Sequence, residues 1–141
     1  MSPKYAVAAY QAGLAYAHLE QFASAAEYLK QGLVLDPNNY HAAHDLGAAF
    51  VRLKRFDESI AAFRQCTRIN SEYASCHQSL GEILQFTGRT DEALPELRKA
   101  VELAPQNRNA HLALAKAFEA KGLTEEAQAE FRKAAAVAQN P

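Results

Sequence analysis

The segment AAHDLGAAFVRLKRFDESIAAF, which runs from Ala42 to Phe63, holds the pattern that decides the fold. Its apolar residues recur at helical spacing in two blocks, and the short break KRFD at 54–57 separates the blocks. The segment therefore predicts two helices joined by a tight turn. Gly47 lies inside the first block, where glycine costs roughly 1 kcal/mol relative to alanine. A glycine at such a place needs a packing or a functional reason.

The same pattern returns along the chain at a fixed period of 34 residues. The column of Gly47 holds Gly13, Gly47, Gly81 and Ala115. A second column, of small residues, holds Ala25, Ser59, Ala93 and Ala127, and a third, of large apolar residues, holds Leu29, Phe63, Leu97 and Phe131. Agreement of this kind at one period marks internal repeats. The chain of 141 residues divides into four units, 6–39, 40–73, 74–107 and 108–141, and each unit is predicted to be a helical hairpin.

The 34-residue pattern resembles the tetratricopeptide repeat family, whose signature is W-x2-L-G-x2-Y, then A-x3-F, then P. The stretches LGAAF at 46–50 and LGEIL at 80–84 match its first half, and ALPELRKAVELAP at 93–105 matches its second half. The tryptophan column departs from the family, because it holds Ala9, Ala43, His77 and His111. The resemblance implies an all-α fold in one domain over residues 1–141. That fold is an α-solenoid of four helix-turn-helix repeats, forming a right-handed superhelix.

A packing role explains Gly47 best. We expect it to face Ser59 of its own unit, so that two small residues let the helices approach closely while Phe50 and Phe63 fill the space beside them. No strand precedes the glycine and no GxGxxG or GxxxxGK[ST] motif is present, so a phosphate-binding loop is not indicated. On this interpretation Gly47→Ala is near neutral, whereas Gly47→Leu is destabilising.

The composition argues against several classes of partner. Lysine and arginine number 15 against 16 aspartates and glutamates, which gives no positive field for nucleic acid or an anionic membrane. No apolar run approaches the roughly 20 residues of a membrane span, and the first residues lack the pattern of a secretory signal. The two cysteines, Cys66 and Cys76, have no zinc-binding spacing. We therefore expect a cytoplasmic protein.

Metal binding and catalysis are not expected either. His41, His44 and Asp45 share a helix face, but the nearest further ligand, His18, is predicted to lie ~12 Å along the neighbouring helix. Cys76 and His77 are adjacent, and adjacent helical side chains point in different directions. We predict no catalytic residue, no metal and no cofactor. His77 and His111 are expected to be packing residues in the first helices.

A concave groove is the site that the family resemblance implies, lined by the first helix of each unit. The positions carried over to it mix aromatic, amide, imidazole and charged side chains, which suits the backbone of an extended peptide. They are Tyr10, Gln11, Leu14, His18, His41, His44, Asp45, Arg52, Gln78, Glu82, Gln85 and Lys116. Some family members bind the acidic C-termini of chaperones through basic residues. The matching places here hold Tyr10, Leu14, Asp45, Ser75 and Ser79, none of them basic, so that ligand is not expected.

The function predicted from these observations is a non-enzymatic scaffold or adaptor that binds a peptide segment of a partner protein. One alternative is a self-association module. Another is a recognition domain of a larger enzyme or secretion component. The last predicted helix, at 125–139, keeps a small apolar stripe, and so we expect a monomer or a weak homodimer through this helix.

Overall fold

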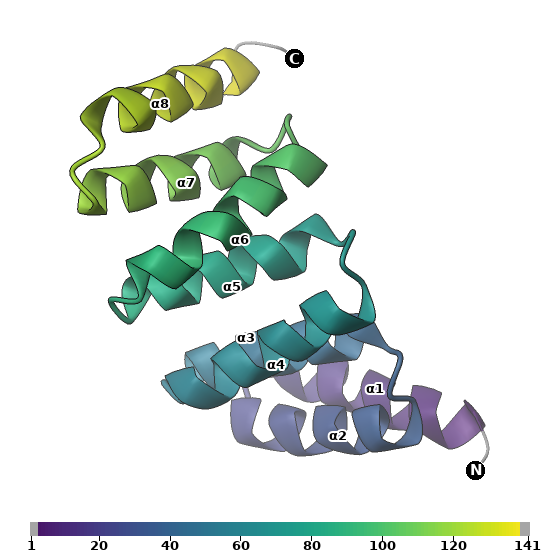
Figure 1. The fold of residues 1–141 in the computed structure, drawn as a ribbon. Coiled ribbons are helices and arrows are strands. Elements are labelled where there is room, and N and C mark those ends of the chain that lie inside the picture. The colour runs from purple at the N-terminus through teal and green to yellow at the C-terminus, as the bar shows by residue number, and fades with distance from the viewer. Residues whose placement is uncertain (1–2, 139–141) are drawn as a thin grey trace. The chain divides into compact units, whose positions relative to one another are not determined.

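A computed structural model of the chain describes residues 3–138 (Figure 1). Within these residues it contains eight α-helices and no strand. The helices are α1 (Pro3–His18), α2 (Phe22–Leu35), α3 (Tyr40–Arg52), α4 (Phe56–Ile69), α5 (Ala74–Phe86), α6 (Thr90–Leu103), α7 (Arg108–Ala120) and α8 (Thr124–Ala138). The predicted all-α fold is confirmed. Gln139, the last residue of the predicted final helix, lies outside the described residues.

The helices form two compact units, α1–α4 and α5–α8. In the first unit α1 packs on α2, α3 packs on α4, and α2 packs on α3. The second unit repeats this scheme with α5–α6, α7–α8 and α6–α7. Figure 1 shows each of the four sequential pairs as an antiparallel hairpin. The first helices of neighbouring hairpins also touch, α1 with α3 and α5 with α7, and this contact brings their outer faces together within each unit.

The core of each hairpin follows the 34-residue period of the sequence. Its small-residue column is fully buried, at Ala25, Ser59, Ala93 and Ala127. Leu29, Phe63 and Leu97 are buried beside it, whereas Phe131 on α8 is only half-buried. Burying a side chain of this size stabilises the fold by roughly 1.5–3 kcal/mol. The repeated columns are therefore the residues that hold each pair of helices together.

Close approach of two helices explains Gly47, as the sequence predicts, but its neighbour is not the predicted one. A Cβ atom placed on Gly47 would lie 2.6–2.8 Å from three ring atoms of Phe63, and Ser59 is not among the nearest contacts. The physical reason is that a helical side chain leans toward the N-terminus of its own helix. Phe63 therefore covers the turn that contains Ser59 and fills the space over the glycine. Gly13 and Gly81 are covered in the same way by Leu29 and Leu97.

One kind of turn ends each first helix. Its residue with positive φ is Glu20 (58°), Lys54 (59°), Gly88 (82°) or Gly122 (74°), at the same place in successive hairpins. The next residue donates its N–H to the carbonyl five positions earlier, as Arg55 does to Phe50 at 2.9 Å. This bond is characteristic of the Schellman motif, which prefers glycine at the left-handed position. The turn fixes how each second helix folds back onto the first.

Candidate functional site

The side chains predicted to contact a peptide all lie on the first helices, and each is at least partly exposed. In the first unit, α1 carries Tyr10, Gln11, Leu14 and His18, and α3 carries His41, His44, Asp45 and Arg52. In the second unit, α5 carries Gln78, Glu82 and Gln85, and α7 carries Lys116. The structure therefore places candidate side chains on neighbouring first helices in both units.

In the first unit, a hydrogen bond joins the two first helices. The Tyr10 hydroxyl on α1 donates to Oδ2 of Asp45 on α3 at 2.9 Å. Nδ1 of His44 lies 3.6 Å from Oδ1 of the same carboxylate. The His44 ring also packs against Phe63, with 5.5 Å between the ring centroids. Tyr10, His44 and Asp45 thus form one half-buried aromatic and acidic patch.

Two other candidates in the first unit contact different neighbours. The Arg52 guanidinium lies 4.3 Å from the ring centroid of Phe22, at the start of α2, so its charge is directed toward a second helix. The His41 ring packs at a tilt of 34° against Tyr40, with 4.3 Å between the centroids. These contacts orient Arg52 toward Phe22 and His41 toward Tyr40.

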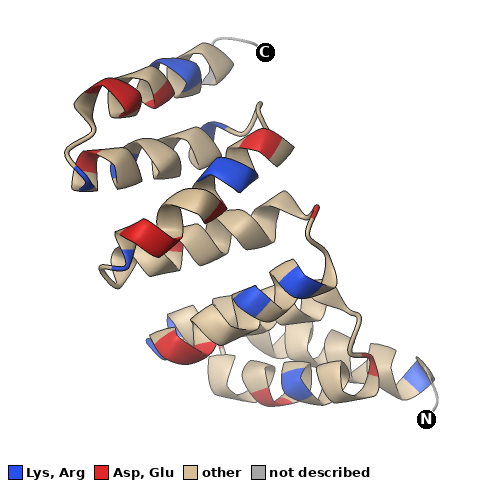
Figure 2. Cartoon of the chain, viewed as in Figure 1, with Lys and Arg blue, Asp and Glu red and all other residues tan. Residues whose placement is uncertain are grey.

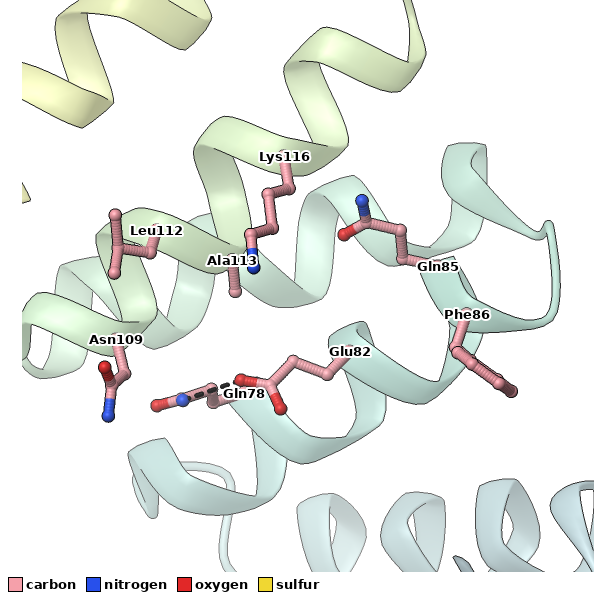
Figure 3. Close-up of a pocket in the computed structure, with 8 residues that line it drawn as sticks. All are labelled: Gln78, Glu82, Gln85, Phe86, Asn109, Leu112, Ala113 and Lys116. Atoms are coloured by element: carbon pink, nitrogen blue, oxygen red, sulfur yellow. Dashed lines mark hydrogen bonds between the residues drawn. The ribbon is translucent and has the colours of Figure 1, made fainter. Parts of the chain in front are cut away.

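The second unit contains a hollow of about 620 Å³ between α5 and α7 (Figure 3). Its lining residues are Gln78, Glu82, Gln85, Phe86, Asn109, Leu112, Ala113 and Lys116. The predicted residues among them are Gln78, Glu82, Gln85 and Lys116. The other four, Phe86, Asn109, Leu112 and Ala113, add an aromatic ring, an amide and an apolar wall, and Phe86 is 73% exposed.

A chain of hydrogen bonds orients the amide at one end of the hollow. Nδ2 of Asn107 donates to Oε1 of Gln78 at 3.0 Å, and Nε2 of Gln78 donates to Oε1 of Glu82 at 2.8 Å. Oδ1 of Asn107 in turn accepts the backbone N–H groups of Asn109 and Ala110, which caps the N-terminus of α7. The cap of α7 thus fixes the position of Gln78 on α5.

Asn107 was not predicted as part of the site, although the sequence carries a signal for it. Asn39 lies two 34-residue repeats before Asn107 and also follows a proline by two residues. Its side chain accepts the N–H of Ala42 at the start of α3. A proline, any residue and an asparagine before a first helix therefore mark the cap in both units.

Three polar side chains in the hollow are available for a ligand. Within the described residues, the Lys116 ammonium group makes no ion pair or hydrogen bond, and neither does the Gln85 amide. The Asn109 side chain is likewise without a partner in this part of the chain. In Figure 3 Lys116 and Gln85 extend from facing helices toward the middle of the hollow.

Two histidines predicted as packing residues also contact carboxylates of the second helices, and the His111 contact is the more deeply buried of the two. Nδ1 of His77 lies 2.7 Å from Oε2 of Glu96, and Nδ1 of His111 lies 2.6 Å from Oε2 of Glu130. Nε2 of His111 also lies 2.8 Å from the carbonyl oxygen of Pro105. Each ring nitrogen of His111 therefore lies within hydrogen-bond distance of an oxygen, one from a carboxylate and one from a backbone carbonyl. The pairs tie α5 to α6 and α7 to α8.

The carboxyl group of Glu130 is stabilised in its charged form. Burial raises the pKa of Glu130, but the hydrogen bonds from His111 and Lys133 outweigh burial and hold this pKa below its usual value. Lys133 donates to Oε1 at 2.9 Å, so both carboxylate oxygens are satisfied. A buried pair with every polar atom bonded fixes the helices in place. His111 and Glu130 therefore support α7 from behind its exposed face.

Neither the acidic, histidine and cysteine side chains nor the helices of residues 3–138 indicate a metal site or a membrane span. No three histidine, cysteine or acidic side chains in this range are arranged to hold a metal ion. No helix in the same range is long and apolar enough to cross a membrane. Figure 2 shows acidic and basic residues spread over most of the helices. Among lysine, arginine, aspartate and glutamate, α1 contains Lys4 alone.

Three sequence models of the tetratricopeptide repeat match the chain, at residues 6–39, 40–73 and 87–141. The chain belongs to the tetratricopeptide repeat family. The resemblance identified from the 34-residue pattern is thereby confirmed. A search of curated protein sequences gave no significant match.

Solved structures of MamA are similar to this tetratricopeptide repeat protein. A crystal structure of MamA is 27% identical, with a TM-score of 0.91 over 98% of this chain and 81% of that chain. MamA AMB-1 is 28% identical, with a TM-score of 0.82 over 94% of this chain and 73% of that one. MamA MSR-1 is 27% identical, with a TM-score of 0.80 over 93% and 75% respectively. The family and these neighbours support a protein-interaction repeat scaffold.

Proposed function

We propose that this tetratricopeptide repeat protein is a non-enzymatic scaffold or adaptor that binds an extended segment of a partner protein on the exposed faces of its first helices. The observation that carries the proposal is the hollow between α5 and α7, in which amide side chains line an open concave surface. The predicted contact residues of both units lie on such faces.

The chemistry of the hollow suits a peptide backbone. An extended segment exposes N–H and C=O groups that need partners when they leave water. The amides of Gln85 and Asn109 can both donate and accept, and neither is used elsewhere within the described residues. Gln78 is already held by Asn107, so less conformational freedom is lost when it contacts a ligand. Leu112 and Ala113 offer an apolar wall for one side chain of the segment.

The face of the first unit adds a second contact area to the proposal. Tyr10 and Asp45 are fixed against each other across α1 and α3, and His44 lies beside them. Tyrosine is enriched in protein interfaces because it combines a large apolar ring with a polar hydroxyl. We propose that Tyr10, His44 and Asp45 contact the part of the partner segment that lies on the first unit.

Several finer expectations belong to the same proposal. They are the division into four repeats at 6–39, 40–73, 74–107 and 108–141, the right-handed superhelix, and a cytoplasmic location. The proposal also includes the absence of a nucleic-acid partner and, at high concentration, a weak homodimer through α8. The balanced charge of the chain supports the exclusion of nucleic acid.

The test uses a displayed library of random 12-residue peptides, selected on the immobilised chain and then measured in solution. The groove variant is Gln85→Ala with Asn109→Ala. Its matched control is Gln31→Ala with Gln128→Ala, two exposed glutamines on the second helices α2 and α8. Each lost neutral hydrogen bond costs about 0.5–1.5 kcal/mol, so the groove variant should bind about tenfold more weakly. Equal affinity of both variants for every selected peptide would contradict the proposal.

A further inference from the structure

The hollow between α5 and α7 is lined by one acidic and one basic residue. Glu82 projects from α5 and Lys116 from α7, and both extend toward the hollow in Figure 3. No ion pair joins them, and neither residue forms an ion pair with any other group among residues 3–138. The hollow therefore presents a negative charge on one wall and a positive charge on the other.

Glu82 is held on its own side of the hollow. Its Oε1 accepts the amide of Gln78, and Gln78 is fixed in turn by the Asn107 cap of α7. A direct ion pair between Glu82 and Lys116 would have to compete with this chain of hydrogen bonds. The second carboxylate oxygen of Glu82 has no partner within the described residues, and it is available to a ligand.

We infer that this hollow selects an extended peptide segment that carries one acidic and one basic side chain on the same face. The acidic side chain contacts Lys116 and the basic side chain contacts Glu82. In an extended chain, side chains two positions apart lie on one face and are separated by about 6.6 Å. Neighbouring helix axes lie about 8–10 Å apart, so two such side chains can reach opposite walls. The inference rests on the proposed function and names the class of segment that the second unit takes.

The charges give the bound segment a direction as well as a composition. A segment that crosses the hollow from α5 to α7, with acid and base in one order, places both charges correctly in only one of its two orientations. Reversing the segment puts the acid beside Glu82 and the base beside Lys116, and like charges repel. An uncharged segment of the same length can still use the amides of Gln85 and Asn109. Charge therefore adds selectivity to a contact that the amides make possible.

The experiment uses four fluorescein-labelled 12-residue peptides that are otherwise identical and rich in alanine and threonine, with one leucine. Their central triplets carry aspartate and lysine, aspartate and glutamine, glutamine and lysine, or two glutamines, each with one residue between. A second set reverses the order. Binding is measured by fluorescence anisotropy at low salt, with the wild type, Lys116→Gln and Glu82→Gln. The matched control is Lys99→Gln with Glu102→Gln, a lysine and a glutamate on the second helix α6.

For the wild type we expect the peptide with both charges to bind most tightly. Exposed ion pairs contribute modestly, so each matched charge should tighten binding about two- to fivefold. Lys116→Gln should remove the benefit of aspartate and keep that of lysine, and Glu82→Gln should do the reverse. The control variant should keep both benefits, and added salt should weaken them.

Two results would overturn the inference in distinguishable ways. If all the peptides bind with equal affinity, or if the benefit of aspartate persists in Lys116→Gln, then Lys116 and Glu82 do not select the charges of the segment, and the proposed peptide groove stands. If no peptide of either set binds at millimolar concentration, the inference fails together with the groove on α5 and α7.

Discussion

Substituting alanine for two different helical glycines should change stability in opposite directions. At Gly47 a new Cβ would lie 2.6 Å from Cε1 of Phe63, and at Gly32 it would lie 3.5 Å from its nearest neighbour, the backbone nitrogen of Tyr10. Both glycines lie within helices of the first unit, so one unfolding transition reports on both. Only Gly47→Ala forces atoms of the core to move.

The magnitude follows from the contact distances. An ordinary contact begins at about 3.4 Å, so the Phe63 ring must retreat by roughly 0.8 Å inside a core where it is 3% exposed. Overpacking of this kind costs about 1–3 kcal/mol. This cost is partly offset, because alanine is about 1 kcal/mol more favourable than glycine inside a helix. Gly47→Ala should therefore destabilise the protein by about 1 kcal/mol, and Gly32→Ala should stabilise it by about 0.5–1 kcal/mol.

The assay is urea denaturation of the full chain, followed by circular dichroism, with the free energy of unfolding compared among the wild type and the two variants. The structure replaces the near-neutral outcome that the sequence alone suggests for Gly47→Ala. Equal stabilisation by both substitutions would refute the packing argument, because it would mean that Phe63 does not fill the space over Gly47.

Three further outcomes are expected. Lys54→Gly should stabilise the protein by about 1 kcal/mol because φ at Lys54 is 59°, whereas Gly88→Ala should destabilise it by a similar amount; calorimetry of both variants checks the sign. Glu130→Gln should destabilise the protein by about 3 kcal/mol at pH 7, because it removes the buried carboxylate that His111 and Lys133 contact. The pKa of Glu130 is lowered in the folded state, so its contribution to the free energy of unfolding is complete above the ordinary pKa of 4.5 and is lost as the pH falls through the folded pKa. Urea denaturation between pH 3 and 7 should therefore show a free energy of unfolding that changes less with pH in Glu130→Gln than in the wild type. Sedimentation over a hundredfold concentration range should give a monomer at micromolar concentration, and Val137→Glu should weaken any dimer that forms above it.

The sequence predicted the helical hairpins well because their apolar residues repeat at one period. The glycine column predicted close approach of two helices, since no other residue lacks a Cβ. It indicated Phe63 beside the glycine but named Ser59 as the facing residue, because the lean of a helical side chain toward the N-terminus of its helix was not taken into account. The left-handed turn positions were also missed, since two of them hold Glu20 and Lys54 rather than glycine.

The candidate site was predicted only in part, for similar reasons. The positions of Gln78, Glu82, Gln85 and Lys116 follow from the repeat frame, and they line one hollow. The pairs His77–Glu96 and His111–Glu130 have the same separation and lie one repeat apart, which is a signal present in the sequence. Their roles were not predicted, because a histidine replacing an aromatic residue is more often a packing residue.

The central claim is that a protein segment binds the first helices, and side-chain amides offer a direct measurement. Glutamine and asparagine NH2 groups can be observed by NMR in the 15N-labelled chain as a selected 12-residue peptide is added. We expect the signals of Gln85 and Asn109, on α5 and α7, to shift during the titration. The signals of Gln31 and Gln128, on α2 and α8, should stay in place. Shifts confined to Gln31 and Gln128 would contradict the claim and place the binding surface on the second helices.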